Sequence, residues 1–368
     1  MKTFADLIKE VQEPGLCHQC GGCVAFCSAI NYGALELGAD GRPRYSNKEK
    51  CIECGICHSI CPVIHELDED TKKLVSWSAP MGHIMGNAVA RAISPQVRAQ
   101  ATDGGVITAL LLNLFDRGRI EAAIVSKTTG PFQRRPWLAL SREDIVAAAG
   151  FHFDTLPSIK HFSDAYTTYS PSIAGLGEVA KKPLKRVAFV GTPCQINALR
   201  RMEVLGVVPS DAIKFHVGLF CAGNFQFGPE QRQRLEQMGN FSWTEVHKVN
   251  LKEELLIHLN SGEIRAIPLN QLNFMKRHAC RFCEDYAAEF ADISCGGIGA
   301  PEGWTTVIVR SPLGREVLAK AMGTDIELFS SREDPTLLSL AMAKVLEWSG
   351  KKKAAALENF QTLEKKAV

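Results

Sequence analysis

The chain has 368 residues, of which 46% are hydrophobic and 22% charged, as in folded globular proteins and unlike disordered or fibrous chains. Its 42 Lys and Arg residues nearly balance 40 Asp and Glu residues, and the net charge of +2 offers no strong field for nucleic acid or anionic lipid. The longest apolar runs are far shorter than the roughly 20 residues of a membrane helix, and the N-terminus lacks the apolar region of a signal peptide. We therefore expect a cytoplasmic protein with no nucleic-acid partner and no direct membrane span.

The 13 cysteines are unevenly distributed, with eight of them between Cys17 and Cys61. These eight form two copies of the spacing C-x2-C-x2-C-x3-C, which is typical of bacterial-type ferredoxins. In such proteins three cysteines of a tight loop bind one [4Fe–4S] cluster, and the fourth binds the other cluster. We therefore assign one cluster to Cys17, Cys20, Cys23 and Cys61, and the second to Cys27, Cys51, Cys54 and Cys57.

Two other uses of these cysteines are less compatible with the sequence. Disulfides are typical of small secreted chains, and zinc sites rarely need three cysteines in one loop twice. One departure from the ferredoxin pattern is that Cys27 is followed by Ser28, whereas Cys61 is followed by the usual Pro62.

Between the two copies, residues 34–47 contain the turn signal Asp40-Gly41 flanked by short apolar runs, which predicts a hairpin. We expect residues 1–67 to form a ferredoxin-like domain. Charged residues, followed by Pro80 and Gly82, predict a linker over 68–84.

From residue 85 the pattern alternates between strands and helices, which indicates an α/β core with at least partly parallel strands. The expected strands are 88–92, 122–126, 186–190 and 215–219, and the expected helices are 106–115, 141–150 and 195–202. We assign 85–330 to this domain and 331–368 to a C-terminal helical segment. Lys351 to Lys353 are expected on a solvated helix face, with docking to a partner as the alternative. The fold class is thus α/β (α+β), a dicluster ferredoxin domain fused to a mixed α/β domain with a helical C-terminus.

The remaining five cysteines suggest further redox chemistry. Cys194 and Cys221 each follow a predicted strand, and Cys280 and Cys283 form a C-x2-C pair. Because strand ends of an α/β sheet converge on one edge, these four thiols could hold a third [4Fe–4S] cluster. Buried free cysteines and a redox-active pair explain the same spacing, and Cys194 at a helix N-terminus could also be a nucleophile. Cys295 is a fifth candidate.

Two glycine-rich segments, 103–105 and 296–304, could allow the backbone to approach a phosphate or a ring closely. Neither matches a dinucleotide-binding or P-loop motif, and ordinary turns explain them equally well.

Several segments together resemble the coenzyme F420 hydrogenase/dehydrogenase beta-subunit family. The matching segments are 99–108 (AQATDGGVIT), 191–195 (GTPCQ), 218–221 (GLFC), 280–286 (CRFCEDY) and 291–305 (ADISCGGIGAPEGWT). The resemblance covers roughly residues 85–320. With the ferredoxin motifs in front, the order is similar to that of the F420H2-oxidising subunit of F420H2 dehydrogenases and of F420-dependent sulfite reductase.

The resemblance implies an FAD-containing, anaerobic oxidoreductase subunit in which hydride is exchanged between coenzyme F420 and FAD. FAD would convert the hydride chemistry of the deazaflavin substrate into single-electron transfer. [4Fe–4S] clusters would then carry electrons to ferredoxin or to other redox subunits, in the cytoplasm or docked on a membrane complex through partners. An alternative is an F420-independent family member that relays electrons between ferredoxin and another substrate or redox complex. A third is a relay subunit with a vestigial flavin site.

The resemblance also implies site residues. The cluster near the flavin would be held by Cys194, Cys221, Cys280 and Cys283, with Cys295 as a spare or a replacement. The flavin site would be lined by Asp103, Gly104, Gly105, Thr108, Thr192, Gln195, Gly299, Gly303 and Trp304. Trp304 could equally anchor the core, and Lys276 and Arg277 could contact FAD phosphates, the acidic F420 tail or solvent.

Catalysis of this kind depends mainly on positioning the two ring systems and excluding water. We identify no acid–base pair or nucleophile, and the isolated histidines His152, His216 and His278 are expected to be structural.

Overall fold

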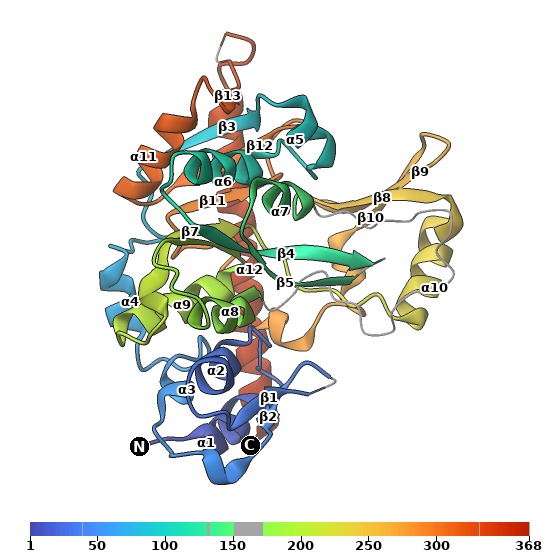
Figure 1. Ribbon diagram of the computed structural model, residues 1–368. Coiled ribbons are helices and arrows are strands. Elements are labelled where there is room, and N and C mark those ends of the chain that lie inside the picture. Colours follow the sequence, from blue (N-terminus) through green and yellow to red (C-terminus); the bar gives the residue numbers. More distant parts are fainter. Residues whose placement is uncertain (39, 131–132, 151–171, 331, 368) are drawn as a thin grey trace.

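The computed structural model describes residues 1–38, 40–130, 133–150, 172–330 and 332–367. Figure 1 shows the N-terminal cysteine-rich unit at the bottom, the main sheet with its helices above it, and a smaller sheet at the side. No helix in these ranges is both long enough and apolar enough to cross a membrane.

The N-terminal unit is built from short elements connected by the cysteine loops. They are α1 (Phe4–Leu7), α2 (Gly22–Val24), α3 (Ile56–Ser59), β1 (Leu35–Leu37) and β2 (Pro43–Tyr45). β1 and β2 pair antiparallel with Leu35 opposite Tyr45, which confirms the predicted hairpin. Phe4 of α1 packs edge-on against Tyr45, with 4.9 Å between ring centroids, and so attaches the N-terminal helix to the hairpin.

The main sheet has parallel strands at its centre and antiparallel strands at its edges. Its spatial order is β13 (Ile326–Leu328), β3 (Gly86–Ala92), β12 (Thr305–Val309), β11 (Ile293–Gly296), β7 (Ile213–Leu219), β6 (Val187–Gly191), β4 (Ala122–Gly130) and β5 (Gln133–Ala139). β11, β7, β6 and β4 run parallel, and the remaining pairings are antiparallel. This confirms the mixed α/β class and brings the carboxyl ends of β6, β7 and β11 to one edge.

Helices cover both faces of this sheet. Because side chains alternate between the two faces along each strand, each strand contributes to two cores. In β4, Ala123 and Val125 face a core shared with α6, whereas Ile124 faces the opposite core. The helices of the first layer are α5 (Pro95–Gln100), α6 (Val106–Asp116), α7 (Arg142–Ala147) and α11 (Pro312–Ala321). The second layer contains α8 (Leu176–Ala180) and α9 (Pro193–Val204).

The second core continues from the sheet into the N-terminal unit. Ile124 of β4 and Leu199 of α9 belong to the same buried cluster as Phe26 and Cys20. Gly22 permits the close approach of α2 to α9, because a Cβ atom there would lie only 3.3 Å from the Cβ of Ala198. The cysteine-rich unit therefore packs directly on the α/β domain.

The segment 68–84, predicted as a linker, begins instead with a helix, α4 (Asp68–Leu74), that packs against α9. Arg201 of α9 pairs with Asp68 and donates hydrogen bonds to the carbonyl oxygens of Cys61, at 3.0 Å, and Ile64. The acidic residues that resembled a solvated linker form the first turn of this helix, where they favourably meet its positive N-terminal end.

A smaller antiparallel sheet lies beside the main one. It contains β8 (Val246–Leu251), β9 (Glu254–Leu259) and β10 (Ile264–Pro268), and α10 (Pro229–Gly239) packs against it. This sheet has its own core, which includes Phe227, Leu235, Trp243 and Ile257.

The C-terminal helix α12 (Leu337–Ala367) runs past the main sheet to the N-terminal unit. The prediction that Lys351 to Lys353 lie on a solvated helix face is only partly correct. Lys351 is exposed and pairs with Glu347, but Lys352 is buried and Lys353 pairs with Glu289 at 2.7 Å. Phe360 packs against Phe282, with 5.0 Å between centroids.

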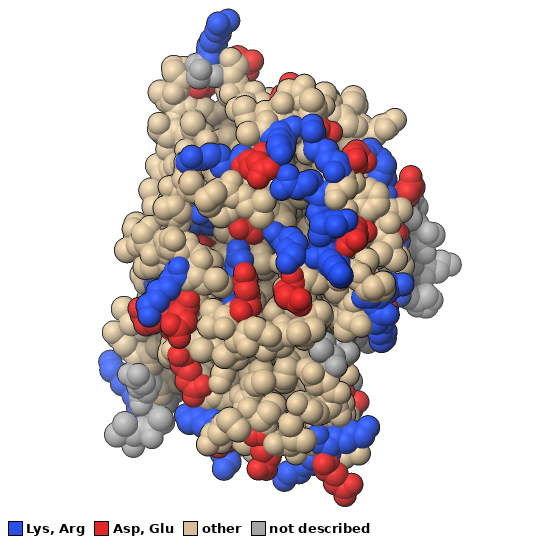
Figure 2. All heavy atoms as spheres, turned by 60° about the vertical axis from the view of Figure 1, so that its left-hand side comes forward, with Lys and Arg blue, Asp and Glu red and all other residues tan. Residues whose placement is uncertain are grey.

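Exposed ion pairs are common on the surface, and Figure 2 shows Lys and Arg interspersed with Asp and Glu on one face. Arg119 and Glu316, for example, approach to 2.8 Å, but the Arg119 side chain is 41% exposed. The Arg201 side chain is only 1% exposed. Exposed ion pairs contribute little to folding stability, whereas removing one partner of a buried pair is strongly destabilising. Substitutions of Arg119 and Arg201 therefore form a matched comparison.

We expect Arg201→Leu to lower the free energy of unfolding by about 1–3 kcal/mol, because it leaves the carbonyl oxygens of Cys61 and Ile64 without this donor and removes one of the partners of Asp68. Arg119→Leu should change it by less than about 1 kcal/mol. Urea denaturation of anaerobically purified protein measures both. Equal effects of the two substitutions would show that Arg201 does not stabilise this interface.

Candidate flavin and iron–sulfur site

Two small cavities in the N-terminal unit are each lined by four cysteines. One cavity is lined by Cys17, Cys20, Cys23 and Cys61. The other is lined by Cys27, Cys51, Cys54 and Cys57. The structure thus brings three cysteines of each copy together with the last cysteine of the other copy. All 13 cysteines are free thiols.

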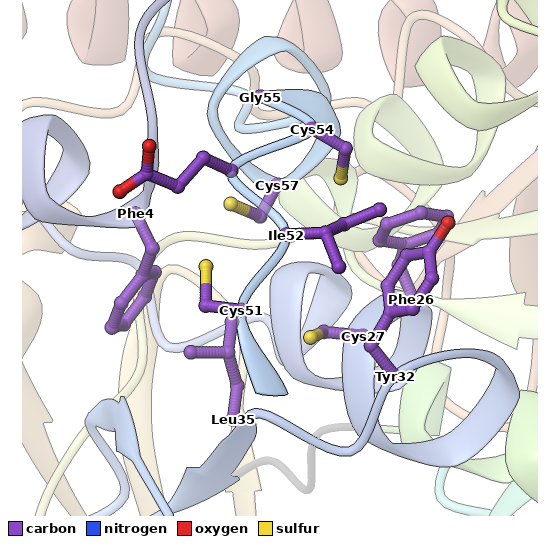
Figure 3. Close-up of a pocket in the computed structure, with 11 residues that line it drawn as sticks. Phe4, Phe26, Cys27, Tyr32, Leu35, Cys51, Ile52, Cys54, Gly55 and Cys57 are labelled. Atoms are coloured by element: carbon purple, nitrogen blue, oxygen red, sulfur yellow. The ribbon is translucent and has the colours of Figure 1, made fainter. Parts of the chain in front are cut away.

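Figure 3 shows the second cavity, in which the four labelled sulfur atoms face a common space. Phe4, Phe26 and Leu35 contribute apolar walls. Ile52 lines the same cavity and is 58% exposed, which places this group of thiols near the protein surface.

The chemistry of these thiols suits a cationic iron–sulfur core. Burial raises the pKa of Cys20 to about 11 and that of Cys57 to about 12, because the thiolate is poorly solvated. Burial also raises the pKa of Cys27, whereas backbone hydrogen bonds from Ala34 and Leu35 lower it. Bound iron would compensate the thiolate charge, and backbone donors to sulfur are a known means of tuning such clusters.

A third group of thiols forms at the carboxyl edge of the main sheet. Cys194 begins α9 after β6, Cys221 follows β7, and Cys280 and Cys283 come from the segment around η8 (His278–Arg281). Burial raises the pKa of Cys221 to about 11; the Lys352 ammonium acts against this shift, and Cys280 and Cys283 add to it. Burial and then Cys20, Cys283 and Cys221 raise the pKa of Cys194. The four cysteines that the family resemblance implies as cluster ligands therefore lie near one another.

Within the described ranges, no three His, Cys, Asp or Glu side chains converge closely enough to hold a single metal ion. A [4Fe–4S] core does not require that convergence, because each thiolate binds a different iron atom.

Basic side chains surround this third group, which corrects the view of Lys276 and Arg277 as a solvated pair. Arg277 donates to the carbonyl oxygen of His18 at 3.0 Å, in the loop between Cys17 and Cys20. Burial lowers the pKa of Lys276. Burial alone would lower the pKa of Lys352 as well, but Cys283, Cys221 and Cys280 together hold it above its ordinary value.

The three groups of thiols follow one another through the protein. Cys20 of the first N-terminal group is the neighbour that most strongly raises the pKa of Cys194, after the effect of burial. Cys23 of the same group is influenced in turn by Cys57 of the other group. The order is thus the sheet edge, then the Cys20 group, then the surface-near Cys57 group.

A cavity of about 310 Å³ lies against the third group, and Cys221 lines it. Its walls come from the carboxyl ends of β6, β7 and β11, from Val125 and Ser126 in β4, and from the N-terminus of α6. Asn250 and Lys252 close one side from the smaller sheet, so this sheet contributes to the site.

Four of the nine residues carried over for the flavin line this cavity, namely Asp103, Gly105, Thr108 and Thr192. The other five lie outside it. Gly104 donates to Thr305 Oγ1 at 3.0 Å, and Gln195 is fully buried beside Gly191. Gly299 packs against Ala341 of α12, and Gly303 lies in the loop before β12. Trp304 packs edge-on against Phe329 with the Arg91 guanidinium over its ring, as expected for an anchor.

Cys295 lines the cavity, and the pKa of its thiol shows no influence from the other thiols. It is 1% exposed, and burial alone raises its pKa to about 12. His216 is buried and contacts Asp292, whereas His278 contacts the carbonyl oxygen of Gly15 at 3.3 Å; neither lines the cavity. His152 lies outside the described residues.

Sequence reasoning missed several lining residues, including Arg134 and Lys252, whereas Gly297 lies in the glycine-rich segment 296–304. Lys252 is at the turn between β8 and β9, with its Nζ 3.6 Å from Asp103 Oδ1. No local motif marks Arg134 and Lys252, because they approach the cavity only through the packing of separate segments.

The cysteine geometry predicts which substitutions share an effect. Cys27→Ser should damage the same cluster as Cys54→Ser, whereas Cys61→Ser should damage the cluster shared with Cys20. Electron paramagnetic resonance of the reduced protein distinguishes the signals, and iron analysis counts the loss. If Cys27→Ser instead removed the signal lost in Cys20→Ser, the exchange of the fourth ligand would be wrong.

Comparisons with known proteins agree with this geometry. Residues 9–62 match the 4Fe–4S dicluster domain. Residues 88–163 and 184–332 match the N-terminal and C-terminal parts of the coenzyme F420 hydrogenase/dehydrogenase beta subunit. The coenzyme F420 hydrogenase beta subunit of Methanosarcina barkeri is 30% identical, over 63% of this chain and 77% of that protein.

Two further relatives cover most of the chain. A subunit of the F420H2 dehydrogenase of Methanosarcina mazei is 25% identical, over 96% of this chain and 94% of that protein. A chain of the F420-reducing [NiFe] hydrogenase complex from Methanosarcina barkeri has a TM-score of 0.65 and 26% identity, over 78% of this chain and 94% of that chain. The protein therefore belongs to the coenzyme F420 hydrogenase/dehydrogenase beta-subunit family of electron-transfer oxidoreductases and carries an N-terminal 4Fe–4S dicluster domain.

Proposed function

We propose that this chain binds FAD in the 310 Å³ cavity and exchanges hydride between coenzyme F420 and FAD. Single electrons then pass through three [4Fe–4S] clusters to ferredoxin or to another subunit of a redox complex. The family membership and the functions for which the relatives are named support coenzyme F420 as the substrate.

One observation carries the proposal: Cys221 belongs to the cavity wall and also to the third group of thiols. Electrons that leave a ring bound in the cavity would therefore reach a thiolate-bound cluster at once. Cys194 of this group interacts with Cys20 of the first N-terminal group, and Cys23 of that group interacts with Cys57 of the second. A cavity connected to the surface by successive thiol groups is the arrangement that electron transfer requires.

The cavity residues fit a flavin. FAD supplies the ability to accept a hydride and to release two electrons one at a time. Gly297 allows the Asp103 carboxylate to lie directly against the backbone in the cavity wall, because a Cβ atom there would lie only 2.6 Å from an Asp103 carboxylate oxygen. Lys252 and Arg134 provide positive charge for phosphates, and apolar Val106, Leu111 and Ile298 exclude water from the ring.

The direct test is F420H2 oxidation by anaerobically reconstituted protein with a viologen as the electron acceptor. We expect loss of deazaflavin absorbance coupled to viologen reduction, and about 12 iron atoms per chain for three cubes. Cys221→Ser should leave about 8 iron atoms and interrupt viologen reduction. A wild-type iron content of about 8 would reject the third cluster.

The same preparation distinguishes the alternatives. Bound FAD without F420H2 oxidation would support an F420-independent family member that uses ferredoxin and another substrate. Absence of FAD from the denatured protein would support a relay subunit with a vestigial flavin site.

Gly297→Val should abolish FAD binding while leaving about 12 iron atoms, because its side chain would displace the Asp103 carboxylate from the cavity wall and neither residue is a cysteine ligand. Gly86→Val is the matched control, since a Cβ atom at Gly86 has no neighbouring atom within 4 Å. Released FAD is measured by fluorescence after denaturation. Wild-type FAD content in Gly297→Val would place the flavin elsewhere.

A further inference from the structure

The C-terminal helix places one buried ammonium group beside the third group of thiols. Lys352 of α12 is 9% exposed, and its Nζ donates to the carbonyl oxygens of Cys221 at 2.6 Å and Asp285 at 2.8 Å. Its neighbours on the helix differ: Lys351 is exposed beside Glu347, and Lys353 pairs with Glu289. The sequence of three lysines therefore contains one that is directed into the protein.

Lys352 forms no close ion pair with an acidic side chain in the described part of the chain. Among the residues that the structure describes, its ammonium forms no ion pair with a carboxylate, because its bonds are to main-chain oxygens. The Asp285 carboxylate instead accepts a hydrogen bond from the backbone of Glu289 at 2.9 Å. Burying an unpaired ammonium is costly unless a negative group lies close by.

The negative groups that act most strongly on Lys352 are the thiolates of Cys283, Cys221 and Cys280, followed by the Asp285 carboxylate. Lys276 approaches the same thiols, with its side chain passing so close to Gly223 that a Cβ atom there would lie 2.5 Å from it. A [4Fe–4S] core with four thiolates is negatively charged, and reduction adds one more negative charge.

We infer that Lys352 raises the reduction potential of the cluster held by Cys194, Cys221, Cys280 and Cys283. A fixed positive charge in a poorly solvated site stabilises the reduced cluster more than the oxidised one, because the reduced cluster carries the additional electron. The C-terminal helix thereby makes the cluster beside the cavity a better acceptor for electrons leaving that cavity. This inference rests on the third cluster of the proposed function.

The test is a redox titration of the full-length, reconstituted protein, followed by electron paramagnetic resonance. Lys352→Gln retains a hydrogen-bond donor but removes the charge, Lys352→Met removes both, and Lys352→Arg retains both. Lys351→Gln is the matched control on the exposed side of the same helix. The two ferredoxin clusters provide internal references in every variant.

We expect Lys352→Gln and Lys352→Met to shift the midpoint of one cluster to lower potential, with the other two midpoints unchanged. Lys352→Arg and Lys351→Gln should retain the wild-type midpoints. An unchanged midpoint in Lys352→Gln with all three clusters present would overturn the inference and leave the proposed function intact. Loss of the third cluster in the Gln and Arg variants alike would also overturn it, since Lys352 would then only hold the ligand segments. A wild-type protein without a third cluster would overturn both proposals.

Discussion

The apolar contact between α9 and the cysteine-rich unit determines how the redox groups are placed. The inner surface of the main sheet, the helices α8 and α9 and the ferredoxin loops share one buried core. Gly22 allows α2 to approach Ala198, and the buried Arg201 satisfies carbonyl oxygens at the end of the second cysteine motif. Without this contact the Cys20 group would have no fixed position relative to Cys194, and electron transfer depends steeply on such positions.

The topology of the sheet places the remaining groups. Because β6, β7 and β11 are parallel, the residues that follow them meet at one edge, where Thr192, Cys194 and Cys221 lie. The same edge forms the wall of the cavity. A cavity and a group of thiols therefore share a boundary, and Cys221 belongs to both.

The C-terminal helix completes the site from the opposite end of the chain. It spans the molecule from the main sheet to the N-terminal unit, where Phe360 packs on Phe282 close to Cys283. Lys352 lies midway along this course, beside Cys221. Its amphipathic sequence predicts a helix but does not indicate which of three consecutive lysines is buried, because that depends on how the helix rotates against its neighbours.

The sequence alone determined the composition of the ferredoxin unit, its hairpin and the exchange of Cys27 and Cys61, because ligand spacing within a short loop is a local property. It also predicted the strands β3, β4, β6 and β7 and the helices α6, α7 and α9 from their periodicity. Only the tertiary structure decided that Cys295 lines the cavity, that Gln195 and Trp304 lie outside it, and that Lys252 and Lys352 reach the site. These placements result from packing between segments far apart in the chain, which no local pattern encodes.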